Sequence, residues 1–227
     1  MARSSKDTPA YLGVDTSIKG LKMALFGEEG GLIASISDYK NTASRSLSLY
    51  FSTLRKACQI EVKDLKGIVV IKGPGSFTGL KVGVSFVKGL AMASGLKVAG
   101  ISTLKALALS AAYLTDNRAR NIISLLPIIR NEIVGARYSY ENGKWIEGAI
   151  STDTEMLKSK DFKVIGGNLK DELKEHMENY ALFPDGTLPE SWGSEGVRLL
   201  QEGEFEDIMS LDPWYGKEPE IRKPPAV

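Results

Sequence analysis

The residues from Gly73 to Lys81 have the composition of a loop that could hold an anion. They read Gly-Pro-Gly-Ser-Phe-Thr-Gly-Leu-Lys and follow a continuous apolar run that is typical of a buried strand. A helical pattern comes next, and backbone N–H groups at the start of a helix attract phosphate. Gly73, Gly75 and Ser76 are the candidate phosphate contacts. The alternative is a tight turn with a helix cap and no ligand.

Neither common nucleotide motif is complete in this loop. The Walker pattern requires lysine and then serine or threonine directly after its last glycine, but Leu80 follows Gly79. The dinucleotide fingerprint requires Gly-x-Gly-x-x-Gly, and here the third glycine comes one residue late. The loop therefore supports phosphate binding only weakly.

The composition excludes several kinds of site. The chain has 227 residues, a formal net charge of +1, one histidine and one cysteine. One cysteine cannot form an internal disulfide, and one histidine cannot supply a paired-histidine metal site. His176 lies in a charged segment and is expected to be exposed, while Cys58 lies on an apolar helical face. Ser76 lacks the pattern of a catalytic serine. We predict no catalytic residues, no metal and no cofactor.

The sequence also predicts where the protein is found. The first nine residues are polar and contain no apolar stretch of the kind found in signal peptides. No run of about 18 apolar residues is present, so no membrane span is expected. We predict a cytoplasmic location.

Apolar patterns predict two similar halves. Each half opens with three strands joined by tight turns, and the second contains the hairpin signal Asn142-Gly143. An internal duplication explains this similarity, and two unrelated meanders are the alternative. The polar residues 115–120 mark a boundary, so we predict lobes at 1–115 and 116–227. The predicted strands are 10–14, 21–26, 32–37, 67–71, 96–99, 122–129, 133–140, 145–150 and 162–165; the predicted helices are 44–58, 77–94, 102–114, 169–180 and one within 186–210.

Two helices of the first half are a candidate contact surface. The helix over 77–94 contains three glycines, each of which costs about 1 kcal/mol relative to alanine. Close approach of another backbone would offset this cost, and that backbone could belong to this chain or to a partner. Under the second explanation, leucine at Gly83 abolishes a complex while the chain still folds. The candidate partner-binding residues are Leu47, Tyr50, Phe51, Leu54, Phe77, Thr78, Gly79, Lys81, Val82, Gly83 and Phe86.

Three segments resemble one family of bacterial proteins. Residues 73–84, continued by Lys88-Gly89-Leu90-Ala91, closely resemble the signature of the TsaB (YeaZ) family. Residues 12–17 are similar to the opening strand of that family, and Pro213-x-Tyr215 with Arg222 is similar to its C-terminal end. The resemblance covers most of the chain and is weak from 151 to 212.

The resemblance implies a fold and a function. The fold is α/β, of the actin-like and sugar-kinase-like (ribonuclease H-like) kind, with two related lobes. The implied function is that of a non-catalytic subunit for threonylcarbamoylation of adenosine 37 in tRNAs that read codons starting with A. In the family, TsaD is the transferase and the binding partner, and the ATPase TsaE joins the assembly. A homodimer is expected when the chain is alone, and tRNA is contacted mainly through the partner.

The chain departs from the family pattern at two places that concern nucleotide chemistry. Actin-like ATPases need an acidic residue in each lobe to organise Mg²⁺. Asp15 stands at the first position, but the duplication places Ile129, beside Arg130, at the second. Ala43-Ser44 stands where many members have His-Ser. The candidate vestigial nucleotide site consists of Asp15, Thr16, Ser17, Gly73, Gly75 and Ser76.

Two alternatives stay open. The first is a small-molecule kinase or ATPase of the same superfamily, which would use Asp15 and the Gly73 loop. The second concerns Arg118, Arg120, Arg130 and Arg137 near the lobe boundary, which could contact tRNA phosphate. For these arginines, a solvated surface is the favoured interpretation.

Overall fold

A computed structural model gives the fold, and it describes residues 10–18, 20–40, 43–116, 118–127, 133–152, 163–166, 180–182 and 186–216. The first half contains five strands and three α-helices in an order close to the predicted one. A short 3-10 helix at Val62–Asp64 was not predicted. The elements are β1 (Tyr11–Asp15), β2 (Leu21–Phe26), β3 (Leu32–Asp38), α1 (Ala43–Cys58), β4 (Gly67–Gly73), α2 (Phe77–Ser94), β5 (Lys97–Ser102) and α3 (Thr103–Leu114).

The second half repeats the strand pattern and ends in one helix. Its elements are β6 (Asn121–Pro127), β7 (Ile133–Glu141), β8 (Lys144–Ser151), β9 (Lys163–Gly166), β10 (Tyr180–Leu182) and α5 (Pro189–Glu202). The predicted helix over 169–180 lies outside the described residues, except for Tyr180, which begins β10. Ile129, Arg130, His176 and Arg222 also lie outside them.

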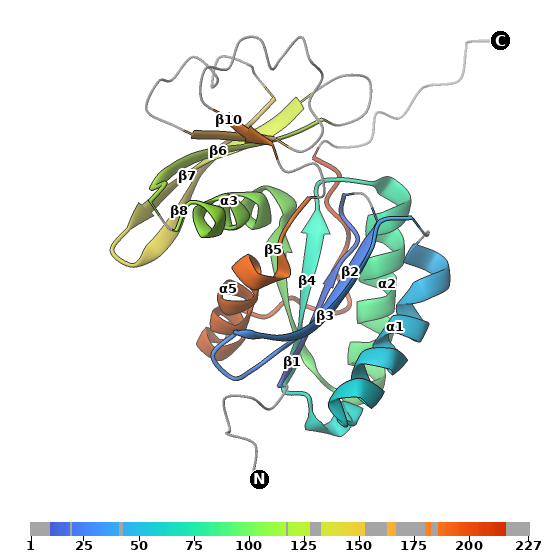
Figure 1. The fold of residues 1–227 in the computed structure, drawn as a ribbon. Helices are drawn as coiled ribbons and strands as arrows, with labels where there is room; N and C mark the ends of the chain where they lie inside the picture. The colour runs from blue at the N-terminus through green and yellow to red at the C-terminus, as the bar shows by residue number, and fades with distance from the viewer. Residues whose placement is uncertain are drawn as a thin grey trace, which may run out of the picture.

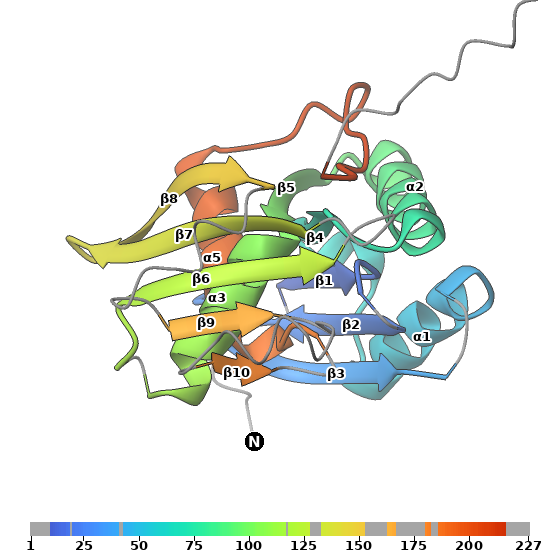
Figure 2. The ribbon, with the colours of Figure 1, turned by 90° about the horizontal axis from the view of Figure 1, so that it is seen from above.

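The two sheets have the same topology. The first has the strand order β3-β2-β1-β4-β5 and the second β10-β9-β6-β7-β8. In each sheet an antiparallel meander of three strands pairs in parallel with the strands that follow it. Figures 1 and 2 show the two sheets as separate layers, with α3 between them. The predicted α/β fold, with two halves that repeat the same strand pattern, is confirmed.

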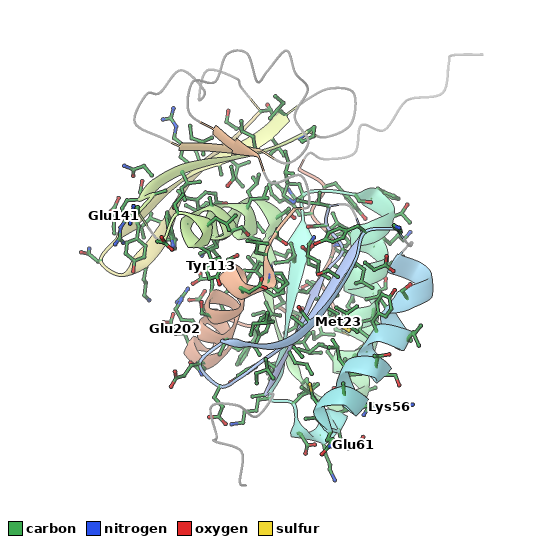
Figure 3. The ribbon with its side chains drawn as sticks, in the orientation of Figure 1. Met23, Lys56, Glu61, Tyr113, Glu141 and Glu202 are labelled. Atoms are coloured by element: carbon green, nitrogen blue, oxygen red, sulfur yellow. The ribbon has the colours of Figure 1, made fainter. Side chains whose placement is uncertain are left out.

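The central strands of the first sheet are buried on both faces. Successive side chains of a strand point to opposite faces, so one strand contributes to two cores. In β4, Ile68 and Val70 join the core beneath α1 and α2, while Val69 and Ile71 join the core beneath α5. Figure 3 shows Met23 of β2 among the side chains that fill the first of these cores. Among the described residues, no helix has the length and apolar character to cross a membrane.

Helix α5 differs from the expected division of the chain at residue 116. It packs mainly on α3, β4 and β5 of the first half (Figure 1). It reaches the second sheet through the ion pair of Glu202 with Lys144 of β8, at 3.4 Å. Trp192 explains this position, because its side chain is fully buried and packs edge-on against Phe26 with ring centroids 5.2 Å apart. A Cβ atom at Gly13 would meet the same indole ring, so glycine makes room for it. The described end of the chain thus completes the first lobe.

Candidate functional site

The residues of the candidate nucleotide site come together, but they bind one another. The Ser76 N–H donates to the carbonyl oxygen of Ser17 at 2.6 Å. A Cβ atom at Gly75 would overlap that same carbonyl, so the loop backbone lies directly on the end of β1. The Ser76 hydroxyl accepts a hydrogen bond from the Gly79 N–H at 3.2 Å, which caps α2. The Ser76 N–H is therefore donated within the chain, and the Ser76 hydroxyl serves as a helix cap.

Asp15 is the only carboxylate in this group, and both of its oxygens have partners. Oδ1 accepts hydrogen bonds from the Ser17 N–H at 2.8 Å and the Ser17 hydroxyl at 2.6 Å. Oδ2 accepts a hydrogen bond from the Thr187 hydroxyl and lies 3.8 Å from Nζ of Lys22. The Asp15 and Lys22 side chains are both almost completely buried. Asp15 thus ties β1 to β2 and to the segment that precedes α5.

The other end of the loop is covered by the C-terminal segment. The Trp214 N–H donates to the carbonyl oxygen of Lys72 at 2.7 Å. Gly73 has a φ of 115°, a conformation that favours glycine, and a Cβ atom there would overlap the Trp214 carbonyl. The Tyr215 ring stacks on Phe77 with centroids 4.8 Å apart. This segment therefore holds the start of the loop, as Ser17 holds Gly75 and Ser76.

Two members of this cluster were missed at the sequence level. Lys22 is the cross-strand partner of Asp15 in the β1–β2 hairpin, so the hairpin register could have identified it. Thr187 is 172 residues away from Asp15, and nothing in its local sequence indicates the contact.

The glycine face of α2 packs against this chain. A Cβ atom at Gly79 would overlap the Thr16 carbonyl oxygen, and one at Gly83 would overlap the Thr16 side chain. Close approach of Thr16 is therefore what the two glycines allow. The expectation that leucine at Gly83 leaves the fold intact is wrong, because the Gly83 position has no free space.

Gly89 provides the contrast, because a Cβ atom there would meet no other atom within 4 Å. We expect Gly89→Ala to raise the free energy of unfolding by about 1 kcal/mol, through helix propensity alone. Gly83→Ala should instead lower it by about 1–3 kcal/mol, through overpacking against Thr16. Urea unfolding of both variants measures the difference. Equal effects at the two positions would contradict the packing described above.

The predicted partner-binding residues divide into buried, exposed and partly buried sets. Leu47, Leu54 and Gly83 are buried in this chain, so they support α1 and α2 from within. Phe77, Thr78 and Lys81 are exposed, with Phe77 at 57%. The remaining ones are partly buried: Tyr50, Phe51, Gly79, Val82 and Phe86. Phe51 and Phe86 join the two helices through an edge-on ring contact with centroids 5.9 Å apart.

The outer side of these helices exposes further small and apolar residues. Ser85, Gly89 and Ala93 follow Lys81 at a spacing of four and are all exposed, so they form one stripe along α2. Met92, beside this stripe, is 63% exposed, and Leu49 on α1 is 61% exposed. Figure 3 shows Lys56 pointing away from the sheet on the outer side of α1. We call the exposed residues Leu49, Lys81, Ser85, Gly89, Met92 and Ala93 the outer helix face.

The other candidates of the sequence lie apart from this cluster. Cys58 is partly buried and packs against the core beneath α1. Arg118 and Arg120 are exposed just before β6, and Arg137 lies on β7. Within the described ranges, no three His, Cys, Asp or Glu residues are grouped so that they could hold a metal ion.

Comparison with known proteins places the chain in a family. Residues 30–181 match the profile of the family described as TsaD, tRNA N6-adenosine threonylcarbamoyltransferase. The tRNA threonylcarbamoyladenosine biosynthesis protein TsaB of Bacillus subtilis is 32% identical over 218 residues, which cover 90% of this chain and 92% of the relative. The chain belongs to the TsaB family. The resemblance noted in the sequence is thereby confirmed.

Two further comparisons define this TsaB-family relationship. The tRNA N6-adenosine threonylcarbamoyltransferase of Lawsonia intracellularis is 35% identical over 96 residues, covering 42% of this chain but only 26% of the transferase. The YeaZ structure from Pseudomonas aeruginosa superposes with a TM-score of 0.73 at 20% identity, covering 91% of this chain and 99% of that one. The TsaB and YeaZ proteins thus match nearly end to end, whereas this transferase is matched over about a quarter of its length.

Proposed function

We propose that this TsaB-family protein is a non-catalytic subunit in the biosynthesis of threonylcarbamoyladenosine at position 37 of tRNA. It acts by binding the transferase TsaD through α1 and α2, with TsaE joining the assembly, in the cytoplasm. The name of the Bacillus subtilis relative supports the pathway. The observation that carries the proposed mechanism is the outer helix face, which is exposed on the two helices that the family resemblance assigns to partner binding.

The outer helix face has the properties of a surface for helix packing. Its stripe of Ser85, Gly89 and Ala93 has little side-chain bulk, so a partner helix can approach α2 closely. Leu49 and Met92 add exposed apolar surface. Burying this surface against a partner would stabilise the complex. Below the surface, Leu47 and Leu54 pack α1 into the core, and Gly83 packs α2 against Thr16. The surface offered to a partner is therefore rigid. Complex formation would cost little conformational entropy in α1 and α2.

The non-catalytic part of the proposal rests on the contacts of Asp15. A carboxylate that organises Mg²⁺ needs oxygens that are available to the ion and its water ligands. Here Ser17 occupies one oxygen and Thr187 the other, and the Lys22 ammonium lies where it would repel a cation. The kinase or ATPase alternative would require all three contacts to be broken.

Binding to TsaD from the same organism is the experiment for this proposal. Sedimentation velocity of the two purified proteins should show a one-to-one complex. The chain alone should form a homodimer through the same face, and TsaD should dissociate it. Calorimetry with Mg-ATP addresses the alternative: ATP binding that is lost in Asp15→Asn, together with no TsaD complex, would favour the ATPase.

A further inference from the structure

A second candidate site lies on the other side of the first sheet. A cavity of about 530 Å³ opens between α3, α5 and the β7–β8 hairpin, within the size range of small-molecule pockets. None of its lining residues belongs to the Gly73 loop or to the outer helix face. The lining comprises Leu109, Ala112, Tyr113, Arg120, Tyr140, Gly143, Trp145, Glu190, Ser191, Ser194, Glu195 and Arg198.

One end of the cavity holds an arginine in a fixed orientation. The guanidinium of Arg120 lies over the Tyr140 ring, 4.3 Å from its centroid. Tyr140 is itself held by an edge-on contact with Trp145, with centroids 5.2 Å apart, and its backbone N–H donates to the Arg120 carbonyl oxygen at 2.8 Å. Stacking leaves the N–H edges of the guanidinium free to bind an oxyanion in two places at once.

The carboxylate at the centre of the cavity is paired with other basic side chains. Glu195 is a partly buried acid of the lining. Its carboxylate lies 2.5 Å from Nζ of Lys105 and accepts two hydrogen bonds from Arg198 at 3.0 Å. Burial alone would raise the pKa of Glu195, but these hydrogen bonds outweigh burial and hold its pKa below the usual value. Glu195 is therefore ionised, and its carboxylate is paired with Lys105 and Arg198. Among the residues that the structure describes, Arg120 has no acidic partner.

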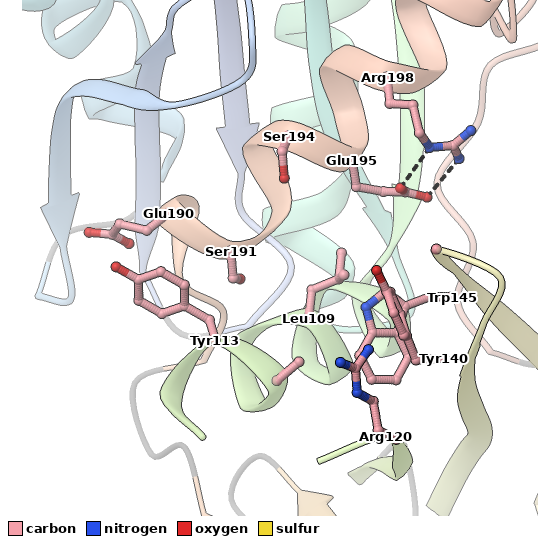
Figure 4. A pocket seen from close by; sticks show the side chains of 12 residues that line it. Leu109, Tyr113, Arg120, Tyr140, Trp145, Glu190, Ser191, Ser194, Glu195 and Arg198 are labelled. Carbon is pink, nitrogen blue, oxygen red and sulfur yellow. Dashed lines mark hydrogen bonds and ion pairs between the residues drawn. The ribbon is translucent and has the colours of Figure 1, made fainter. Parts of the chain in front are cut away.

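The other end of the cavity has a different character. Figure 4 shows Tyr113 and Glu190 on one side of Leu109, and Arg120 with Tyr140 and Trp145 on the other. The Tyr113 side chain is 50% exposed and offers a flat ring. Glu190 is exposed and, within the described part of the chain, has no ion-pair partner. This end therefore suits a planar group that carries N–H donors, because a carboxylate accepts hydrogen bonds only.

We propose that the cavity between α3, α5 and the β7–β8 hairpin binds a nucleotide, with its phosphate on Arg120 and its base beside Tyr113 and Glu190. Aromatic rings stack with any base, and a carboxylate pairs best with the adjacent N–H donors of guanine. The nucleotide could be free in solution or be the exposed end of an RNA strand, because both present the same phosphate and base. This site is independent of the partner-binding proposal.

Calorimetry on the full chain tests the proposal with GMP and with guanosine. GMP should bind, and guanosine should bind about tenfold or more weakly because it lacks the charged hydrogen bonds to Arg120. Arg120→Gln should remove this difference by weakening GMP alone, whereas Tyr113→Ala should weaken both ligands. Arg118→Gln is the matched control, since Arg118 is exposed two residues away but does not line the cavity.

A single-stranded RNA with a 5′-phosphorylated guanosine distinguishes the two sources. If the RNA competes with GMP and binds more tightly than GMP does, the natural ligand is an RNA end. If the RNA does not compete with GMP, the ligand is a free nucleotide. The proposal is overturned if neither GMP nor the RNA binds at millimolar concentration. It is also overturned if guanosine binds as tightly as GMP, or if Arg118→Gln and Arg120→Gln weaken GMP equally.

Discussion

Gly89→Arg is expected to abolish binding to TsaD while leaving the chain folded. A Cβ atom at position 89 meets no other atom within 4 Å, so the arginine side chain extends outward from α2 into the space that a partner helix would fill. We expect the Kd for TsaD to rise by about 100-fold or more, which corresponds to roughly 3 kcal/mol. Calorimetric titration of TsaD with the variant measures this change.

Gly89→Ala is the matched control, because it changes the same position without adding bulk or charge. Its affinity for TsaD should stay within about threefold of the natural chain, a difference below 1 kcal/mol. Both variants should unfold at or above the urea concentration of the natural chain, because the helix gains propensity at this position. If the Gly89→Arg variant binds TsaD with normal affinity, α2 is not part of the interface.

Asp15→Ala is expected to lower the free energy of unfolding by about 3–5 kcal/mol, the range for removing one partner of a buried ion pair. The substitution leaves the Lys22 ammonium buried without its carboxylate. It also removes the acceptor for the hydroxyls of Ser17 and Thr187. Urea unfolding monitored by circular dichroism gives the value.

The double variant Asp15→Asn with Lys22→Met distinguishes a structural role of the Asp15 carboxylate from a catalytic one. It removes both charges together, so it should recover much of the stability that Asp15→Ala loses. If Asp15→Ala alone costs less than about 1 kcal/mol, the carboxylate is not the structural tie that its contacts indicate.

Local patterns were sufficient to predict most of the elements. The predicted strands over 21–26 and 32–37 and the helix over 77–94 match β2, β3 and α2 closely, because periodicity and tight turns are encoded within a few residues. The position of α5 was not predictable in this way. Its burial depends on Trp192 meeting Gly13 and Phe26, which are far away in the sequence.

The candidate site was predicted only in part, because its local features can be read from the sequence and its long-range contacts cannot. The helix propensity cost of Gly79 and Gly83 correctly indicated a close approach, but an approach from Thr16 and one from a partner produce the same sequence pattern. The sequence identifies Asp15 as a carboxylate at the end of a strand. It does not identify Thr187, which donates a hydrogen bond to Asp15 from the other end of the chain. Only the tertiary structure distinguishes a phosphate loop from a loop packed on its own chain.

Reconstituted threonylcarbamoylation of tRNA tests the central claim most directly. The assay would combine TsaD, TsaE and tRNA with either Gly89→Arg or the double variant Asp15→Asn with Lys22→Met, both confirmed as folded. A partner subunit that acts through its outer helix face predicts background activity with Gly89→Arg and nearly full activity with the double variant. Full activity with Gly89→Arg and loss of activity with the folded double variant would contradict it, and would place the function in the Asp15 cluster instead.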